Sequence, residues 1–265
     1  MDMPKGYIDP EYLQAMGKFL GSLKERTYSS MQAKAGDKVL DVGCGPGIDT
    51  IALSRIVGST GQVFGVDYDN GMITKSEQHA QKEGVSAWVK HKQTDASSLP
   101  FDTGYFNSCR SERLFQHLLN PAMTLNEMIR VTKVGGTVVV LDTDWGAIST
   151  DTNEIDIERR LNRFYTEQML NNGFSGRQLY RLFKKQGLGN VSFEVFPLST
   201  TNYALSRQII DMDKLEKEAI AKNIITEDEL LRYQTDSEQA DAEGVYFSHG
   251  SMILVTGQKM GKQSR

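Results

Sequence analysis

The sequence predicts an α/β fold made of parallel βαβ units. Three observations favour this fold class. Short apolar runs alternate with amphipathic segments that carry helix caps, a glycine-rich turn follows the first apolar run, and an acidic residue ends or follows each of the next two runs. Because the carboxyl ends of parallel strands meet on one side of a sheet, these polar groups are expected to lie close together.

The first half of the chain is expected to alternate helices and strands. Pro10 follows Asp9 as the first residue of a leading helix, a position that suits proline because its missing N–H is not needed there. Gly84 ends a later helix, since glycine readily adopts the left-handed conformation that closes helices. In order, we expect a helix from Asp9 with Leu13, Met16 and Leu20 on one face, a strand over 38–42, a helix over 48–57, a strand over 62–66, a helix over 71–82 and a strand over 87–92.

The second half continues this alternation. Asn120 and Pro121 cap a helix whose apolar face carries Leu125, Met128 and Ile129. Around it we expect strands over 105–109 and 137–141, then a helix that begins at a capping box of Ser175 and Gln178, carries Leu179, Leu182 and Phe183 and ends at Gly187, and finally strands over 191–196 and 251–258.

The segment 200–244 separates the last two strands and is charged and helical in pattern, with a second capping box formed by Thr226 and Glu229. We interpret it as an inserted helical lid. A helical pair packed beside the sheet, without contact to a ligand, explains the pattern equally well. The chain is expected to be a single domain, 1–265, with a helical N-terminal segment over 1–35 and this insertion.

Composition excludes several classes of protein. A net charge of −4 and a pI near 5.7 argue against a protein that binds nucleic acid through its phosphate backbone, and favour a small or neutral partner. Cys44 and Cys109 belong to no CxxC pair or cluster with histidines, so neither a disulfide framework nor a metal site is expected. No apolar run has the length of a signal peptide or a membrane span, so we expect a cytoplasmic protein.

The stretch VLDVGCGPG, residues 39–47, is the glycine-rich turn. An apolar strand ends here and a helix follows, so backbone N–H groups and bare Cα atoms face the side of the sheet where open α/β folds bind ligands. Gly43, Gly45 and Gly47 give the spacing GxGxG, which differs from the GxGxxG of pyrophosphate-binding dinucleotide folds. A tight loop that binds nothing would have the same composition, so the interpretation depends on neighbouring residues.

Two acidic residues supply that context. Asp67 ends the second strand about twenty residues beyond the turn, where a carboxylate can accept hydrogen bonds from both ribose hydroxyls. Asp95 follows the third strand, where it could accept a proton from an exocyclic amine. Each aspartate alone could simply cap the next helix, but three consecutive strands with a polar group at one side of the sheet favour a nucleotide-like ligand.

Five segments occur in this order between Lys38 and Asp142: VLDVGCGPG, VFGVDYD, TDASSLPF, FNSCRSERLFQHL and EMIRVTKVGGTVVVLD. Together they resemble the successive motifs of class I S-adenosylmethionine-dependent methyltransferases, and weaker similarity continues to the end of the chain. The branch that looks most similar includes quinone-biosynthesis enzymes and many small-molecule methyltransferases of secondary metabolism. The resemblance implies a Rossmann-like, seven-stranded, mostly parallel sheet with an antiparallel last strand, helices on both faces, and S-adenosylmethionine as cofactor.

The resemblance also implies roles for individual residues. Asp41 would hold the amino group of the methionine moiety, directly or through water, while the glycines of the turn let the backbone approach it. Asp67 would bind the ribose and Tyr68 would lie along the adenine. The other implied cofactor contacts are Gly43, Gly45 and Gly47 in the turn, Asp95 and the Ala96 backbone at the adenine edge, the backbone of Arg110 and Ser111 beneath the methionine part, and Gln116 near the methyl group.

The sequence departs from the commonest family pattern at two places. Gln116 and His117 stand where the family often has two histidines, and Asn107 stands where an acidic residue is usual. These departures leave the fold expectation intact but weaken any expectation of proton transfer through histidine.

Methyl transfer requires mainly that a nucleophile be placed in line with the S–CH3 bond and that water be excluded. His117 and Asp144 are the candidate catalytic residues, although a backbone-bonded helical histidine and a simple cap explain them without catalysis. Trp145 and Tyr203 are candidates for the wall of a substrate site, although aromatic residues at such positions are as often part of the core.

Three alternatives remain open from the sequence. A dinucleotide-dependent oxidoreductase shares the strand, turn and carboxylate pattern but usually carries GxGxxG. A catalytically silent protein of the same fold would be expected to have damaged cofactor motifs, and these are intact. RNA methylation is disfavoured by the acidic balance and by the lack of a motif for a flipped base. The methyl acceptor, the atom methylated and the oligomeric state are not predicted.

Overall fold

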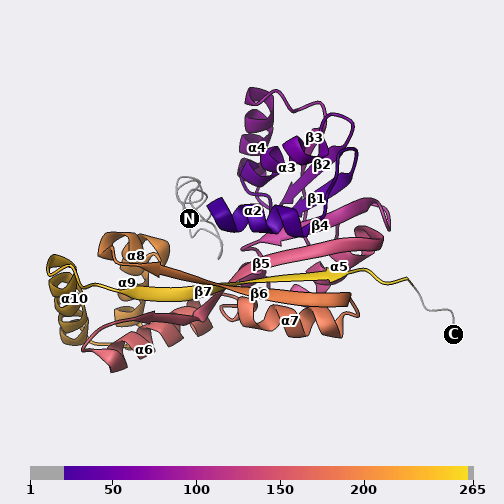
Figure 1. Ribbon diagram of the computed structural model, residues 1–265. Coiled ribbons are helices and arrows are strands. Elements are labelled where there is room, and N and C mark those ends of the chain that lie inside the picture. The colour runs from indigo at the N-terminus through magenta and orange to yellow at the C-terminus, as the bar shows by residue number, and fades with distance from the viewer. Residues whose placement is uncertain (1–20, 262–265) are drawn as a thin grey trace.

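A seven-stranded sheet organises the computed structural model, which describes residues 21–261 (Figure 1). The strand order is β3-β2-β1-β4-β5-β7-β6, in which the first five strands are parallel and β7 is antiparallel to β5 and β6. The strands are β1 (Lys38–Val42), β2 (Gln62–Asp67), β3 (Val89–Gln93), β4 (Phe106–Glu112), β5 (Thr132–Thr150), β6 (Gly189–Thr200) and β7 (Ser248–Gln258).

Helices cover both faces of this sheet. On one face α2 (Gly21–Ser30), α3 (Ile48–Val57) and α4 (Asn70–Lys82) pack against alternate strand residues such as Val39 and Val63. On the other face, α5 (Pro121–Val131) and α7 (Ser175–Lys185) pack against the residues between them, such as Leu40 and Val140. Because consecutive strand residues point to opposite faces, one set of strands supplies both cores.

A group of helices lies at one end of β5, β6 and β7, which extend past the neighbouring strands (Figure 1). It contains α6 (Ile155–Phe164), a π-helical turn (Tyr165–Met169), α8 (Tyr203–Ile209), α9 (Met212–Ala221) and α10 (Glu227–Ala242). Leu161, Leu215 and Tyr233 form part of a third hydrophobic core between α6, α9 and α10. The segment between the last two strands therefore shares a separate core with α6 beside the sheet.

The predicted fold class is confirmed, including the antiparallel last strand and the helices on both faces. The bounds predicted for β1 and α3 match the structure, and the Thr226–Glu229 capping box is present at the start of α10. A short 3-10 turn, Phe115–His117, follows β4. The leading helix expected from Asp9 falls in the segment that precedes the described residues.

Three expectations need correction. β5 is 19 residues long rather than ending at Leu141, because the ladder with β7 continues through the polar residues and resumes at Ser149. Ser175 does not cap α7, because its hydroxyl donates to the carbonyl oxygen of Thr143 and Phe174 occupies the cap position. Helix α6 was not predicted from the sequence. Its apolar face packs against α9 and α10, and this packing was not predicted either.

Candidate functional site

The glycine turn after β1 is fixed by hydrogen bonds to β2. The N–H groups of Gly43 and Cys44 both donate to the carbonyl oxygen of Val66, at 2.8 and 2.9 Å. Gly43 has a φ of +75°, and a Cβ there would lie 3.1 Å from the Leu114 side chain. Gly47 has a φ of +83°, and a Cβ there would lie 2.7 Å from Ser76 on α4. Both positions need glycine, for backbone conformation and for the close approach of neighbouring segments.

Asp67 closes the turn from the end of β2. One carboxylate oxygen accepts from the N–H of Gly45 at 2.9 Å, and the other accepts from the N–H of Asp69 at 2.9 Å. Burial raises the pKa of Asp67 above its ordinary value. A carboxylate has about four acceptor sites, so two remain for a ligand. The residue is thus held in place by the backbone while keeping capacity to bind hydroxyl groups.

A cavity of about 650 Å³, the larger of two described here, opens beside this turn. Tyr68 stands 75% exposed among the lining residues, and the carboxylate of Asp95 accepts from the N–H and the hydroxyl of Ser97, both at 2.8 Å. Of the residues predicted to bind the cofactor, those that line the larger cavity are Gly43, Gly45, Asp67, Tyr68, Asp95 and Ala96.

The other predicted cofactor residues lie outside this lining. Gly47 is the N-cap of α3, and Ser111 donates its hydroxyl to the carbonyl oxygen of Val42 within the sheet. The Arg110 side chain is fully buried and contacts three carboxylates, with atom separations of 3.2 Å to Asp41, 3.2 Å to Asp49 and 2.6 Å to Glu112. Near this cluster the cavity is lined by Asp49, Glu112 and Arg113 rather than by Asp41, Arg110 and Ser111.

Asp41 is therefore a buried partner of Arg110. Its second carboxylate oxygen is buried and has no hydrogen-bond partner among residues 21–261. Burial raises the pKa of Asp41 to about 7, although the neighbouring Arg110 opposes this shift. Asp41 does not line the larger cavity, so the direct contact with a ligand that the family resemblance implies would require the cavity wall to move. An indirect role, in which Asp41 holds Arg110 in place, fits the geometry.

Sequence reasoning missed Lys24, Asp49 and Glu112, which line the larger cavity together. The Lys24 ammonium lies 2.8 Å from Asp49 and 2.9 Å from Glu112, so helix α2 contributes a cation to the cavity wall. A signal was present in the sequence. Arg110 and Glu112 are two residues apart in a largely buried strand whose other residues carry no charge, and charges on one face of a buried strand require partners.

Gln116 connects the walls of the two cavities through a chain of hydrogen bonds. Its side-chain oxygen accepts from the indole N–H of Trp145, which can only donate, and this fixes the orientation of the amide. The amide nitrogen then donates to the carbonyl oxygen of Arg113 and to Nε2 of His117, both at 3.1 Å. The neutral His117 ring consequently accepts at Nε2 and carries its proton on Nδ1.

His117 lines the larger cavity in a setting that disfavours its charged form. Burial lowers the pKa of His117 to about 4, with a further contribution from the positive charge of Arg113. The ring is therefore neutral at physiological pH, and its basic nitrogen is already engaged by Gln116.

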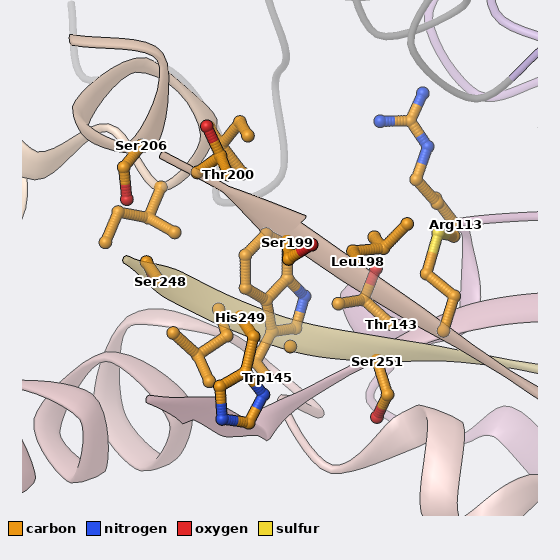
Figure 2. A pocket seen from close by; sticks show the side chains of 15 residues that line it. Arg113, Thr143, Trp145, Leu198, Ser199, Thr200, Ser206, Ser248, His249 and Ser251 are labelled. Atoms are coloured by element: carbon orange, nitrogen blue, oxygen red, sulfur yellow. The ribbon is translucent and has the colours of Figure 1, made fainter. Parts of the chain in front are cut away.

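A smaller cavity, of about 70 Å³, lies where β5, β6 and β7 approach α8 (Figure 2). Trp145 stands in the middle of its lining, and α8 contributes Ser206 and Ile209. Arg113 lines both cavities. The remaining lining residues are Thr143, Ile148, Leu198, Ser199, Thr200, Ile210, Ser248, His249, Gly250, Ser251 and Met252.

Two sequence candidates are placed elsewhere. Asp144 is the neighbour of Trp145 in β5 and so points to the opposite face, where both its oxygens accept from Nε of Arg177 at 2.8 and 2.7 Å. The Tyr203 hydroxyl accepts from Arg207 at 3.0 Å, and its ring packs on Tyr246 with centroids 5.2 Å apart. Neither residue lines either cavity, so Asp144 is not carried forward as a candidate base or Tyr203 as a substrate wall.

Residues 21–261 contain no group of three or more His, Cys, Asp or Glu side chains arranged to hold a metal ion. None of the helices in this range has the length and apolarity needed to cross a membrane.

Replacing Trp145 by Phe should lower the free energy of unfolding by about 1–3 kcal/mol, because it leaves the buried Gln116 oxygen without its donor. Urea denaturation measures this change. Trp88→Phe is the matched control, since the Trp88 indole is half-buried and bonds at 3.3 Å to a Ser54 carbonyl that also accepts from Gly58. Equal losses in the two variants would contradict the assignment.

Known proteins similar to this chain were compared by family, sequence and structure. The family model described as "Methyltransferase domain" matches residues 33–187, more than half of the chain. The demethylmenaquinone methyltransferase of Staphylococcus carnosus is 38% identical over 120 residues, which make up 45% of this chain and 48% of that protein. The chain spans about half the length of the curated relatives that it matches.

Solved structures share the fold at low sequence identity. YcgJ of Bacillus subtilis superposes with a TM-score of 0.65 at 21% identity, with 91% of this chain and 99% of that chain covered. The geranyl diphosphate C-methyltransferase of Streptomyces coelicolor, solved with S-adenosyl-L-homocysteine, gives a TM-score of 0.58 at 15% identity and covers 98% and 88% of the two chains. The predicted class, a methyltransferase, is confirmed at the level of the family. The chain belongs to the methyltransferase domain family.

Proposed function

We propose that this chain transfers the methyl group of S-adenosylmethionine to a small-molecule acceptor. The observation that carries the proposal is the pair of cavities that share Arg113 as a lining residue. The larger cavity has the glycine turn and two strand-end carboxylates that suit a nucleoside. The surface of the smaller cavity is mostly apolar, and it would take an apolar part of an acceptor.

The larger cavity offers complementary groups for each part of the cofactor. Asp67 would accept from the ribose hydroxyls, and Asp95 with Tyr68 would lie at the adenine. The amino-acid end would meet Lys24, Asp49 and Glu112, which supply one cation and two carboxylates for a carboxylate and an ammonium group. In this proposal Asp41 acts through Arg110, and it holds these groups in place rather than contacting the ligand.

The chemistry asks for placement more than for acid–base catalysis. The bound sulfonium supplies an electrophilic methyl carbon and its own leaving group. A nucleophile on the acceptor would attack that carbon in line, the S–C electron pair would return to sulfur to give a thioether, and any proton on the nucleophile would pass to solvent or buffer. Leu118 and Leu119, which line the larger cavity, would help to exclude water from the reacting atoms.

The insertion is proposed to serve as one wall of the acceptor site. Ser206, Ile209 and Ile210 at α8 line the smaller cavity, whereas α9 and α10 pack on α6. The segment 200–244 thus combines the two roles considered from the sequence. α8 faces the cavity, and the helices after it provide support.

A small-molecule acceptor is supported by the names of the relatives and neighbours, which give demethylmenaquinone and geranyl diphosphate as substrates of those proteins. An O-, C- or N-nucleophile, aromatic and quinol-like compounds included, is compatible with the smaller cavity. The acidic balance of the chain supports an acceptor other than nucleic acid. A cytoplasmic role in secondary metabolism remains part of the proposal.

The neutral state of His117 gives a test of the local electrostatics. Its ring should titrate near pH 4, and Arg113→Gln should raise that pKa only partly toward the ordinary value, because burial is the larger cause. Proton NMR of the histidine rings against pH measures both. His91 is the control, since burial also lowers its pKa to about 4 but Arg113 does not contribute. An unchanged pKa of His117 in the variant would contradict the assigned cause.

The function itself is tested by calorimetric titration of the chain with S-adenosylmethionine, S-adenosylhomocysteine and NADH. The first two should bind and NADH should not. Asp67→Ala should weaken both by about 10- to 100-fold, because hydrogen bonds to a charged acceptor are lost. Asp67→Asn keeps an acceptor oxygen for only one of the Gly45 and Asp69 N–H groups, so it should also weaken binding, whereas Asp102→Ala, at an exposed position outside the larger cavity, should bind normally.

Binding of NADH alone would overturn the proposal in favour of an oxidoreductase. Binding of neither cofactor nor NADH would also overturn it and would favour a silent protein of the same fold. Unchanged affinity in Asp67→Ala would remove the ribose assignment.

A further inference from the structure

Arg113 lines both the larger and the smaller cavity, and its position is the junction between them. It follows the last residue of β4, and its backbone is held at a φ of +52° by an N–H bond to the carbonyl oxygen of Leu141 at 2.9 Å. A non-glycine residue in this conformation is uncommon and is retained only where its surroundings over-determine it. Figure 2 shows Arg113 at one end of the smaller cavity, with Trp145 between it and Ser206.

Arg113 has a longer ion pair than the two other cations at this site, Lys24 and Arg110. All three neighbouring carboxylates bond directly to other cations: Asp41 to Arg110, and Asp49 and Glu112 to both Arg110 and Lys24. Within residues 21–261 Arg113 forms an ion pair with Glu112, at 3.7 Å, through an oxygen that lies 2.9 Å from the Lys24 ammonium.

The guanidinium is also largely removed from water. The Arg113 side chain is 11% exposed, and its Nε is buried without a hydrogen-bond partner in the described part of the chain. A guanidinium has five N–H donors in a planar fork that matches the two oxygens of an acidic group. A buried cation with unused donors is costly unless a ligand supplies acceptors.

We infer that the acceptor is an organic anion, whose apolar or aromatic body lies in the smaller cavity and whose acidic oxygens pair with Arg113. This inference rests on the proposed function and names the substrate class of the same site. The apolar part of the ligand would contact Trp145 and Leu198. An anion at the junction would face one guanidinium and, beyond it, the positive sulfonium of the bound cofactor, whereas a cationic acceptor would be repelled by both.

Arg113 is assigned to the acceptor rather than to the cofactor because of where the other cation lies. Lys24 stands with Asp49 and Glu112 in the larger cavity only, so it can meet the carboxylate at the amino-acid end of the cofactor. Arg113 alone among the charged residues lines both cavities. Its position thus makes it a specificity-determining residue for the acceptor.

The test uses the full chain saturated with S-adenosylhomocysteine and titrated by calorimetry with three carboxylates, benzoate, 2-naphthoate and decanoate, and with their uncharged amides. The amides keep size and shape while removing the charge. We expect at least one acid to bind about tenfold or more tightly than its amide. Arg113→Gln should abolish that difference and Arg113→Lys should retain part of it, while the affinity for S-adenosylhomocysteine stays within about twofold of the original chain.

Four results decide the outcome. The expected pattern supports the inference, and retained S-adenosylhomocysteine binding shows that the variants are folded. Equal affinity for acids and amides, or no binding of any of the six by a chain that holds S-adenosylhomocysteine, overturns the inference and leaves the proposed function standing. A loss of S-adenosylhomocysteine affinity in Arg113→Gln with acid binding unchanged assigns Arg113 to the cofactor and also overturns it. Failure of the original chain to bind S-adenosylhomocysteine defeats the proposed function, and the inference falls with it.

Discussion

The buried ion cluster around Arg110 is the interaction on which the site depends. Arg110 stands on β4, contacts Asp41 on β1 and Asp49 on α3, and shares Glu112 with Lys24 of α2. A fully buried guanidinium is tolerated only when its charge is compensated, and removing one partner of such a pair typically costs about 3–5 kcal/mol. The cluster therefore fixes the relative positions of four elements, of which α2, α3 and β4 contribute residues to the wall of the larger cavity.

Some charged residues of this cluster are enclosed in the fold, whereas others face the larger cavity. Arg110 is enclosed and neutralised, so it stabilises the fold without facing a ligand, whereas Lys24, Asp49 and Glu112 reach the surface of the larger cavity. Arg113, one residue after Glu112, is left at the junction with the smaller cavity. A short stretch at the end of one strand thus supplies a structural charge, a cavity wall and the junction residue.

Sequence reasoning predicted the features that depend on backbone conformation. The turn at Gly43 and the carboxylate of Asp67 could be predicted because a βα turn and a strand end fix the place of each group, and both line the larger cavity. Side-chain direction was less predictable. Asp144 and Trp145 were adjacent candidates, and the alternation of a strand sends one to Arg177 and the other into the smaller cavity.

Residues whose partners are distant in the chain were the hardest to predict. The place of Tyr203 depends on its packing against Tyr246, and that of Lys24 depends on carboxylates from α3 and β4. No local pattern specifies such contacts, because they arise only when separate elements pack together. The same reason explains the length of β5, which is set by its ladder with β7 rather than by its own apolar run.

The extent of the family match explains why the cofactor is easier to infer than the acceptor. The family match, 33–187, contains the glycine turn, Asp67, Asp95 and Glu112, but it ends before Leu198, Ile209 and Met252 in the smaller cavity. Acceptor identity therefore cannot be transferred from relatives by that match, since much of the proposed acceptor wall lies outside it. Arg113 and Trp145 lie inside the matched region and also face the smaller cavity. They are the residues that link the proposed cofactor site to the proposed acceptor site.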